Sequence, residues 1–220
     1  MIKERLALIR KRVADAARKI GRDPNEITIV AVSKVKPVAD IVTAYEAGQR
    51  HFGESYIQEF QSKREELPPL PGVVFHMIGR LQSNKTKQAS KFFDVIQTVD
   101  SEKLVRRLNG IGKNVDVFFE VKLSGGESRA GLAEADIEGV KRFVEDCPYI
   151  NLRGLMGMPP WCDDPEHVRP YFQRLRYLAQ QYALPELSMG MSRDFEIAIE
   201  EESTLIRIGT AIFGKRVHPK

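Results

Sequence analysis

The chain has 220 residues and a mass of 25.0 kDa, enough for one large domain or two small ones with a substantial core. Its 42% hydrophobic and 29% charged residues are typical of an ordinary soluble globular protein. The net charge of +4 comes from 34 basic and 30 acidic residues that are interspersed along the chain. The sequence has no long basic run of the kind that forms a nucleic-acid-binding arm, which argues against a nucleic-acid-binding protein.

Cysteine, histidine and hydropathy patterns exclude further classes of protein. Cys147 and Cys162 form no C-x-x-C pair, which argues against a disulfide scaffold or a zinc site, and the histidines show no metal-ligand spacing. No apolar run approaches the roughly 18 residues that cross a bilayer. The charged N-terminus lacks the apolar core of a signal peptide. We therefore expect a cytoplasmic protein that binds no metal, nucleic acid or membrane. A monomer is expected as well, although these patterns do not bear on the oligomeric state.

An amphipathic helix at residues 2–20 is predicted to open the chain, because its apolar residues recur at helical spacing. These residues are Leu6, Ile9, Val13, Ala16 and Ala17. Eight strands are expected to follow, at residues 27–34, 51–55, 73–78, 94–99, 115–122, 152–158, 186–189 and 205–209. Helices are expected between them, at residues 37–47, 56–66, 84–92, from about 101, 133–146, 165–182 and 193–201.

The alternation of strand and helix predicts an α/β fold with parallel pairing and right-handed crossovers. Eight units in about 190 residues fit a compact (β/α)8 TIM barrel better than an open doubly wound sheet. No G-x-G-x-x-G motif follows the first strand, and no shift in composition marks a second domain. We expect one domain over residues 1–220, with the extra helix at 2–20 and the barrel at about 27–214.

The stretch Ile27 to Pro37, I-T-I-V-A-V-S-K-V-K-P, reads as a strand buried on both faces that ends near Lys34. Strand alternation puts Lys34 in the same row as Val30 and Val32. A partly desolvated amine there could attack a carbonyl and form a Schiff base. The simpler alternative is that Lys34 extends into solvent at the strand end. Lys36 lies beyond the strand and is expected to face solvent.

Two loops at the carboxyl ends of the last strands suit a phosphate group. The seventh strand runs into Ser188-Met189-Gly190-Met191-Ser192, and the eighth continues into Gly209-Thr210 at the start of a possible short helix. Backbone N–H groups at a helix start and hydroxyl donors bind anions. Alternatively, Ser192 caps a helix and Gly209 turns the chain. Together with Lys34 across the barrel mouth, the loops predict a phosphorylated carbonyl ligand, with pyridoxal 5′-phosphate as the candidate.

These motifs resemble the YggS/PROSC family of pyridoxal-phosphate homeostasis proteins. The matching segments are A-V-S-K-V-K-P (31–37), F-G-E-S-Y-I-Q-E (52–59), H-M-I-G-R-L-Q-S-N-K (76–85), L-R-G-L-M (152–156), S-M-G-M-S-R-D (188–194) and I-R-I-G-T-A-I-F-G (206–214). They span the length of the expected barrel in order. The resemblance implies a fold-type III barrel, like that of alanine racemase, which holds the cofactor for pyridoxal-phosphate homeostasis.

The resemblance also implies roles for single residues. It implies that Lys34 carries the cofactor as a Schiff base, that Ser192, Gly209 and Thr210 hold its phosphate, and that Arg207 faces the pyridine nitrogen. Cofactor-dependent apo-enzymes are candidate recipients.

Three positions depart from the family pattern. Ser55 stands where the family has an asparagine, which puts a cofactor contact there in doubt. Glu202 stands where the family has a glycine before the last strand. Arg129 replaces a lysine proposed as a secondary carrier, and a guanidinium is a poor Schiff-base nucleophile.

Arg207 favours a binding protein over an enzyme. An arginine can only donate a hydrogen bond, so it keeps the pyridine nitrogen unprotonated and disfavours strong electron-sink chemistry. The tyrosines lie in or beside predicted helices, where packing or surface roles are expected, and we expect the chain to lack the β-domain of alanine racemases. We therefore expect no catalytic residue and no committed reaction.

Two enzymatic alternatives stay open. The first is a small amino-acid racemase that uses the same cofactor. The second is a phosphosugar isomerase whose base is Glu54 or Glu120, although a glutamate beside a strand end is more often a structural ion-pair partner. His76, near the end of the third strand, is expected to pack in the core. Trp161 and Cys162 could either form the rim of the site or pack in the ordinary way.

Overall fold

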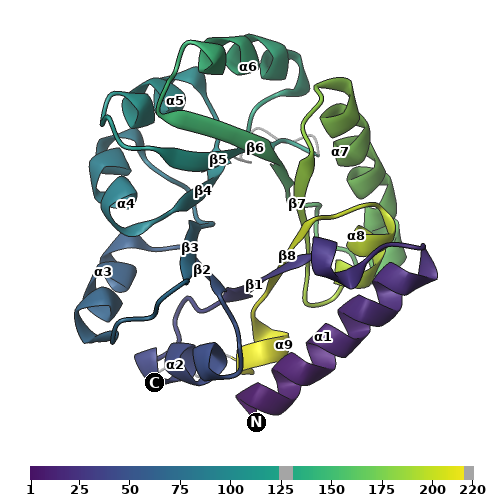
Figure 1. Cartoon of the computed structure of the whole chain (residues 1–220). Coiled ribbons are helices and arrows are strands. Elements are labelled where there is room, and N and C mark those ends of the chain that lie inside the picture. Colours follow the sequence, from purple (N-terminus) through teal and green to yellow (C-terminus); the bar gives the residue numbers. More distant parts are fainter. Residues whose placement is uncertain (124–130, 216–220) are drawn as a thin grey trace.

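The computed structural model describes residues 1–123 and 131–215, which form a closed barrel of eight parallel strands in sequence order (Figure 1). The strands are β1 (Thr28–Val32), β2 (His51–Glu54), β3 (Val74–Met77), β4 (Val95–Val99), β5 (Val115–Val121), β6 (Ile150–Gly157), β7 (Glu186–Met191) and β8 (Leu205–Ile208). β8 pairs with β1 and closes the barrel. The predicted (β/α)8 fold is confirmed.

Helices cover the outside of the barrel. They are α1 (Ile2–Lys19), α2 (Val38–Glu46), α3 (Ile57–Glu66), α4 (Thr86–Phe92), α5 (Glu102–Asn109), α6 (Ile137–Glu145), α7 (Arg169–Gln181), α8 (Phe195–Glu200) and α9 (Thr210–Phe213). The extra helix α1 packs against α2, α8 and α9, and its predicted apolar face is buried. None of the helices in the described part of the chain is long and apolar enough to cross a membrane.

The core has two parts, as the alternation of side chains in a barrel requires. Inside the barrel, an apolar layer consists of Val30, Val95, Phe118, Met156 and Leu205. The larger cluster lies between the outer face of the strands and the helices. Because successive side chains of a strand alternate, the residue two positions after a member of the inner layer also faces the barrel interior.

Two element ends differ from the expectations in ways that matter. β1 ends at Val32, so Lys34 lies in the turn after the strand and is not the last member of its row. Glu202, where a glycine was expected, has a positive φ of 71° just after α8. A glycine adopts this left-handed conformation freely, which explains the expectation, whereas Glu202 adopts it at a cost.

Some sequence predictions fall outside the described residues. The departure at Arg129 is one of them.

Candidate functional site

Two adjoining cavities open at the carboxyl ends of the strands. The first cavity, of about 360 Å³, is lined by Lys34, Trp161, Ser192, Asp194, Arg207 and Thr210 among others. The second cavity, of about 600 Å³, is lined by Lys34, Ser55, Tyr56, Arg80, Glu120 and Lys122 among others. The two cavities share five lining residues, which are Lys34, Ile78, Met158, Pro159 and Met191. Lys34 therefore lies between them.

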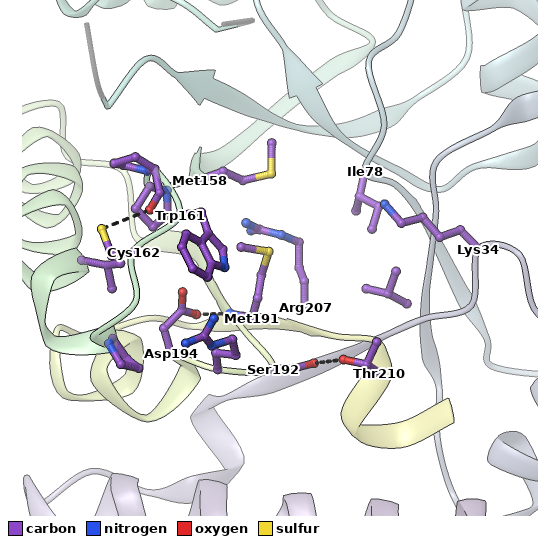
Figure 2. A pocket seen from close by; sticks show the side chains of 16 residues that line it. Lys34, Ile78, Met158, Trp161, Cys162, Met191, Ser192, Asp194, Arg207 and Thr210 are labelled. Atoms are coloured by element: carbon purple, nitrogen blue, oxygen red, sulfur yellow. Dashed lines mark hydrogen bonds between the residues drawn. The ribbon is translucent and has the colours of Figure 1, made fainter. Parts of the chain in front are cut away.

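Lys34 occupies a tight turn whose backbone is unusual. The next residue, Val35, has a φ of 58°, in the left-handed region that β-branched residues rarely adopt. Such strain persists where the surrounding structure enforces it, and it is common at functional sites. Figure 2 shows the half-buried Lys34 side chain extended beside Ile78 at the edge of the first cavity. Val32 and Lys34 both line the first cavity, whereas Ser33 between them bonds Glu54 on the outer side of the barrel.

A buried ion cluster holds the backbone on both sides of Lys34. Lys63 of α3 donates to the carbonyl of Ser33 at 2.9 Å and pairs with Glu54 at 2.9 Å and with Glu59 at 2.6 Å. The Ser33 hydroxyl donates to Glu54, and the N–H of Val35 donates to Glu59 at 2.6 Å. These contacts fix the residues that precede and follow Lys34.

The same cluster decides the role of Glu54. Its carboxylate lies against α3, outside the barrel interior, and Lys63 neutralises it. Burial raises the pKa of Glu54, which the charge and hydrogen bond of Lys63 only partly offset, and one carboxylate oxygen has no hydrogen-bond partner among the described residues. Glu54 is therefore an ion-pair partner and does not line either cavity, which removes it as a candidate base.

The two predicted phosphate loops meet on one side of the first cavity. The Thr210 and Ser192 hydroxyl oxygens lie 3.4 Å apart (Figure 2). Thr210 and Ala211 begin α9, where N–H groups have no carbonyl one turn back within the helix. Gly209 precedes this helix, and its carbonyl accepts from Ile212 and Phe213. Hydroxyl and N–H donors thus gather beside β1, the strand that leads to Lys34, because β8 pairs with β1.

Lys36 also contributes to this side of the site, contrary to the expectation that it faces solvent. Its ammonium donates to the carbonyls of Phe213, Gly214 and Lys215 at 3.0–3.3 Å. A cation at these carbonyls satisfies groups that a helix C-terminus leaves unpaired. Lys36 therefore fastens the end of α9 to the loop that carries Lys34.

Arg207 projects from β8 into the barrel and forms part of the first cavity. Its guanidinium donates to the Ser188 carbonyl at 2.7 Å, to the Ser188 hydroxyl at 2.6 Å and to the Gly157 carbonyl at 3.0 Å. Burial lowers its pKa to about 10, partly offset by Asp194 and Glu120, so the group stays charged at neutral pH. Burial in turn raises the pKa of the Asp194 carboxyl.

A chain of hydrogen bonds runs from Arg207 down the barrel interior. Ser188 contacts Gln97 at 2.6 Å, Gln97 contacts His76 at 2.9 Å, and His76 contacts His51 at 3.0 Å. An arginine can only donate, so it sets the direction of every bond below it. The Ser188 hydroxyl donates to the Gln97 oxygen, and the Gln97 amide donates to Nδ1 of His76. His76 therefore carries its proton on Nε2.

His76 is thus a structural residue of the barrel interior, and it lines neither of the two cavities. Burial lowers its pKa to about 3, and His51 adds to this effect, which keeps the ring neutral. Trp161, by contrast, lies at the rim of the first cavity with 71% of its surface exposed and Arg193 stacked on it. Cys162 lines the same cavity, and its thiol lies 3.6 Å from the Pro160 carbonyl.

Ser55 lies in the second cavity, away from the phosphate loops. A Cβ on Gly79 would lie 2.2 Å from the Ser55 carbonyl oxygen, so only glycine allows the loops after β2 and β3 to approach this closely. Tyr56 also lines this cavity, with 55% of its surface exposed. A packing or surface role was predicted for Tyr56, which is the N-cap residue of α3, whereas the structure places it at the second cavity.

Glu120 faces the barrel interior, two residues after the inner-layer Phe118. Only 6% of its surface is exposed, and its side chain makes no hydrogen bond or ion pair with any described residue. Burial raises the pKa of Glu120, and the nearby charge of Asp100 acts in the same direction, whereas Arg207 and Arg80 oppose the shift. Glu120 lines the second cavity, so a ligand bound there can contact its carboxyl group.

The raised pKa of Glu120 predicts a pH dependence of stability. Between its ordinary value of 4.5 and its folded value, the folded state binds more protons than the unfolded state, so stability falls as the pH rises through this window. Glu120→Gln is therefore expected to unfold at higher urea concentration than the wild type at pH 7, and the difference should vanish near pH 4. The exposed Glu65→Gln serves as control; equal gains in both variants would contradict the prediction.

No group of three or more histidine, cysteine, aspartate or glutamate side chains in the described residues could hold a metal ion. The first cavity brings together Lys34, the two hydroxyl-bearing loops and the buried Arg207, and the second cavity adds Glu120, Arg80 and Lys122. The ion cluster around Lys34 and the chain below Arg207 were missed by the sequence analysis. Lys63 follows Glu59 by one helical turn, but nothing in the sequence places either of them against β1.

The barrel is of the class represented by the N-terminal domain of alanine racemase, whose family model matches residues 5–217. The alanine racemase of Clostridium difficile 630 superimposes with a TM-score of 0.68 over 96% of this chain and 57% of its own, at 13% identity. At that identity the likeness shows the fold alone.

Closer relatives identify the family. The pyridoxal phosphate homeostasis protein of Vibrio alginolyticus is 39% identical over 98% of this chain and 97% of its own length, and that of Escherichia coli K12 is 38% identical over 100% and 98%. The structure of PipY from Synechococcus elongatus PCC7942 with pyridoxal phosphate bound has a TM-score of 0.85 and 38% identity, over 97% of this chain and 100% of that chain. The chain belongs to the family of pyridoxal phosphate homeostasis proteins.

Proposed function

We propose that this protein binds pyridoxal 5′-phosphate and serves in its homeostasis, holding the cofactor without a committed reaction. The observation that carries the proposal is the first cavity, where an amine, hydroxyl donors and a buried guanidinium face one space. A phosphorylated aldehyde with a basic ring nitrogen needs these three kinds of group. The relatives are named for this function, and the PipY structure holds the same cofactor.

Each group of the first cavity has a proposed task. Pyridoxal phosphate supplies an aldehyde that condenses with a lysine amine to a Schiff base, and Lys34 is the lysine. Ser192, Thr210 and the N–H groups that follow Gly209 bind the phosphate. Arg207 donates to the ring nitrogen. Ser55 lies on the far side of Lys34, in the second cavity, so any contact with the cofactor is made from there.

The residues around the first cavity favour a protein that holds the cofactor over an enzyme that catalyses a reaction with it. Arg207 is a fixed cation that cannot take up a proton, so it holds the ring nitrogen unprotonated. The Lys63 cluster fixes Lys34 from both sides, as an anchor requires. Delivery of the cofactor to apo-enzymes of the cytoplasm, which the sequence suggests, is part of the same proposal. A racemase is not favoured by the names of the relatives.

The test of the proposal is the attachment of the cofactor to Lys34. Purified protein mixed with pyridoxal phosphate is expected to show an absorbance band near the visible edge. Borohydride should then fix the cofactor on the peptide that contains Lys34, as mass spectrometry would show. Lys34→Ala should abolish both the band and the labelled peptide, because Lys34 is the one lysine among the described residues that lines both cavities.

Lys122→Ala is the matched control, since Lys122 is a second lysine at the barrel mouth but lines only the second cavity. This variant should keep the band and the label. A band that survives in Lys34→Ala, or a label on Lys122, would show that the Schiff-base assignment is wrong.

A further inference from the structure

The second cavity has a lining that pyridoxal phosphate does not explain. Its charged groups are of both signs: Glu120 from β5, and Arg80 and Lys122 from the loops after β3 and β5. A volume of about 600 Å³ is in the range of small-molecule sites. Only Lys34 and four uncharged neighbours are shared with the first cavity.

Glu120 is the most informative residue of this cavity. Only 6% of its surface is exposed, it faces the barrel interior, and no side-chain hydrogen bond or ion pair joins it to another described residue. A buried carboxyl without a partner is costly to keep, and buried polar groups are satisfied in the great majority of cases. A ligand that brings an ammonium group would provide the missing donors, with up to three N–H bonds available.

The two cations add a second requirement. Arg80 is exposed, Lys122 is half-buried, and neither makes a side-chain hydrogen bond or ion pair with a described residue. Arg80, Lys122 and Glu120 line the same cavity, so one small molecule bound there can meet charges of both signs. A guanidinium is suited to bind a carboxylate in a bidentate manner. A pure anion such as phosphate would meet the carboxylate of Glu120, and a pure amine would leave the cations unpaired.

We propose that the second cavity binds an α-amino acid, whose ammonium group contacts Glu120 and whose carboxylate contacts Arg80 and Lys122. The protein then holds the cofactor and an amino acid in adjoining cavities that meet at Lys34. This inference deepens the proposed function and rests on it for the assignment of the first cavity to the cofactor. The binding of the amino acid itself depends only on the second cavity.

The test uses cofactor-free wild-type protein and isothermal titration calorimetry with three probes. L-alanine carries both charged groups, propionate lacks the amine, and ethylamine lacks the carboxylate. L-alanine is expected to bind, and each of the other two should bind at least about tenfold more weakly, since a charged hydrogen bond contributes about that factor. Equal binding of all three probes, or no binding of L-alanine, would overturn the proposal.

Variants locate the site. Glu120→Gln and Arg80→Met should each weaken L-alanine binding by about tenfold or more. Glu186→Gln is the control, because Glu186 lies at the opposite end of the barrel, where it pairs with Arg153, and this variant should bind as the wild type does. Unchanged affinity in Glu120→Gln would refute the assignment, even if Arg80→Met failed to fold.

A final experiment separates the two cavities. Protein whose cofactor has been fixed with borohydride should still bind L-alanine, because the second cavity stays open. Loss of binding on fixing would place the amino acid in the first cavity and overturn the inference. Failure of the Lys34 labelling would instead contradict the proposed function, while the titration of cofactor-free protein would stand on its own.

Discussion

Lys63→Met is expected to lower the free energy of unfolding by about 3–5 kcal/mol, the cost of removing one partner of a buried ion pair. The Lys63 side chain is 9% exposed and Glu54 is fully buried, so the variant leaves a carboxylate buried between the barrel and α3 without the cation that paired with it. It also leaves the Ser33 carbonyl without its donor. Urea denaturation at pH 7 measures the loss.

The loss of unfolding free energy in Lys63→Met should depend on pH, because it depends on whether Glu54 is ionised. Burial already raises the pKa of Glu54, and removal of Lys63 raises it further. A raised folded pKa means that the folded state gains protons as the pH falls, so the variant recovers stability toward the ordinary glutamate value of 4.5. The destabilisation is therefore largest at neutral pH and above.

The same variant should also affect the site. Because Lys63 holds Ser33 and Glu59 holds Val35, a released cluster lets the turn around Lys34 relax from its strained conformation. Lys63→Met is thus expected to label more slowly with pyridoxal phosphate than the wild type. Lys141→Met is the control, since its pair with Glu145 is exposed and worth at most about 1 kcal/mol. Equal costs in both variants would contradict the cluster's proposed role.

The barrel could be predicted from the sequence because its signals are local. Each strand is a short apolar run bounded by turn residues, and each helix has an apolar face of its own, as Leu6, Ile9 and Val13 of α1 illustrate. Alternation then restricts the connections to right-handed crossovers. Exact ends were less predictable: β1 stops at Val32 because Val35 turns the chain, and no propensity rule anticipates a valine with a positive φ.

The site was partly predictable for a related reason. In this fold the strand ends converge, so residues at those ends meet even though they are far apart in sequence. Lys34, Ser192, Arg207 and Thr210 do line one cavity, whereas Ser55 lines the other. Their roles toward the cofactor stay predictions.

What the sequence could not provide are the partners of these residues. Lys63 and Glu59 lie on the outer helix α3, and only the packing of α3 on β1 brings them to the turn. The chain of Ser188, Gln97 and His76 joins three strands through the barrel interior. Contacts of this kind depend on register and side-chain direction, which periodicity does not specify.

Arg207→Met tests whether the hydrogen bonds that link Ser188, Gln97 and His76 inside the barrel depend on Arg207. The change removes three hydrogen bonds from a charged donor to buried acceptors, which are the carbonyls of Ser188 and Gly157 and the Ser188 hydroxyl, each worth about 1.5–3 kcal/mol. It also removes the cation that faces Glu120 and Asp194. We expect the free energy of unfolding to fall by about 3 kcal/mol or more at neutral pH.

The expected effects of Arg207→Met extend along the chain and can be separated from a general loss of stability. With Arg207 gone, nothing forces the Ser188 hydroxyl to donate to Gln97, so the direction of the bonds to His76 is no longer fixed. Nitrogen-15 NMR of the imidazole rings should show His76 protonated on Nε2 in the wild type and a mixture of tautomers in the variant. Arg207→Lys retains a donor-only cation and should preserve the single tautomer even if it is less stable. A mixture in the wild type would contradict the direction inferred here, and an unchanged tautomer in Arg207→Met would show that Gln97 and Ser188 set it without the arginine.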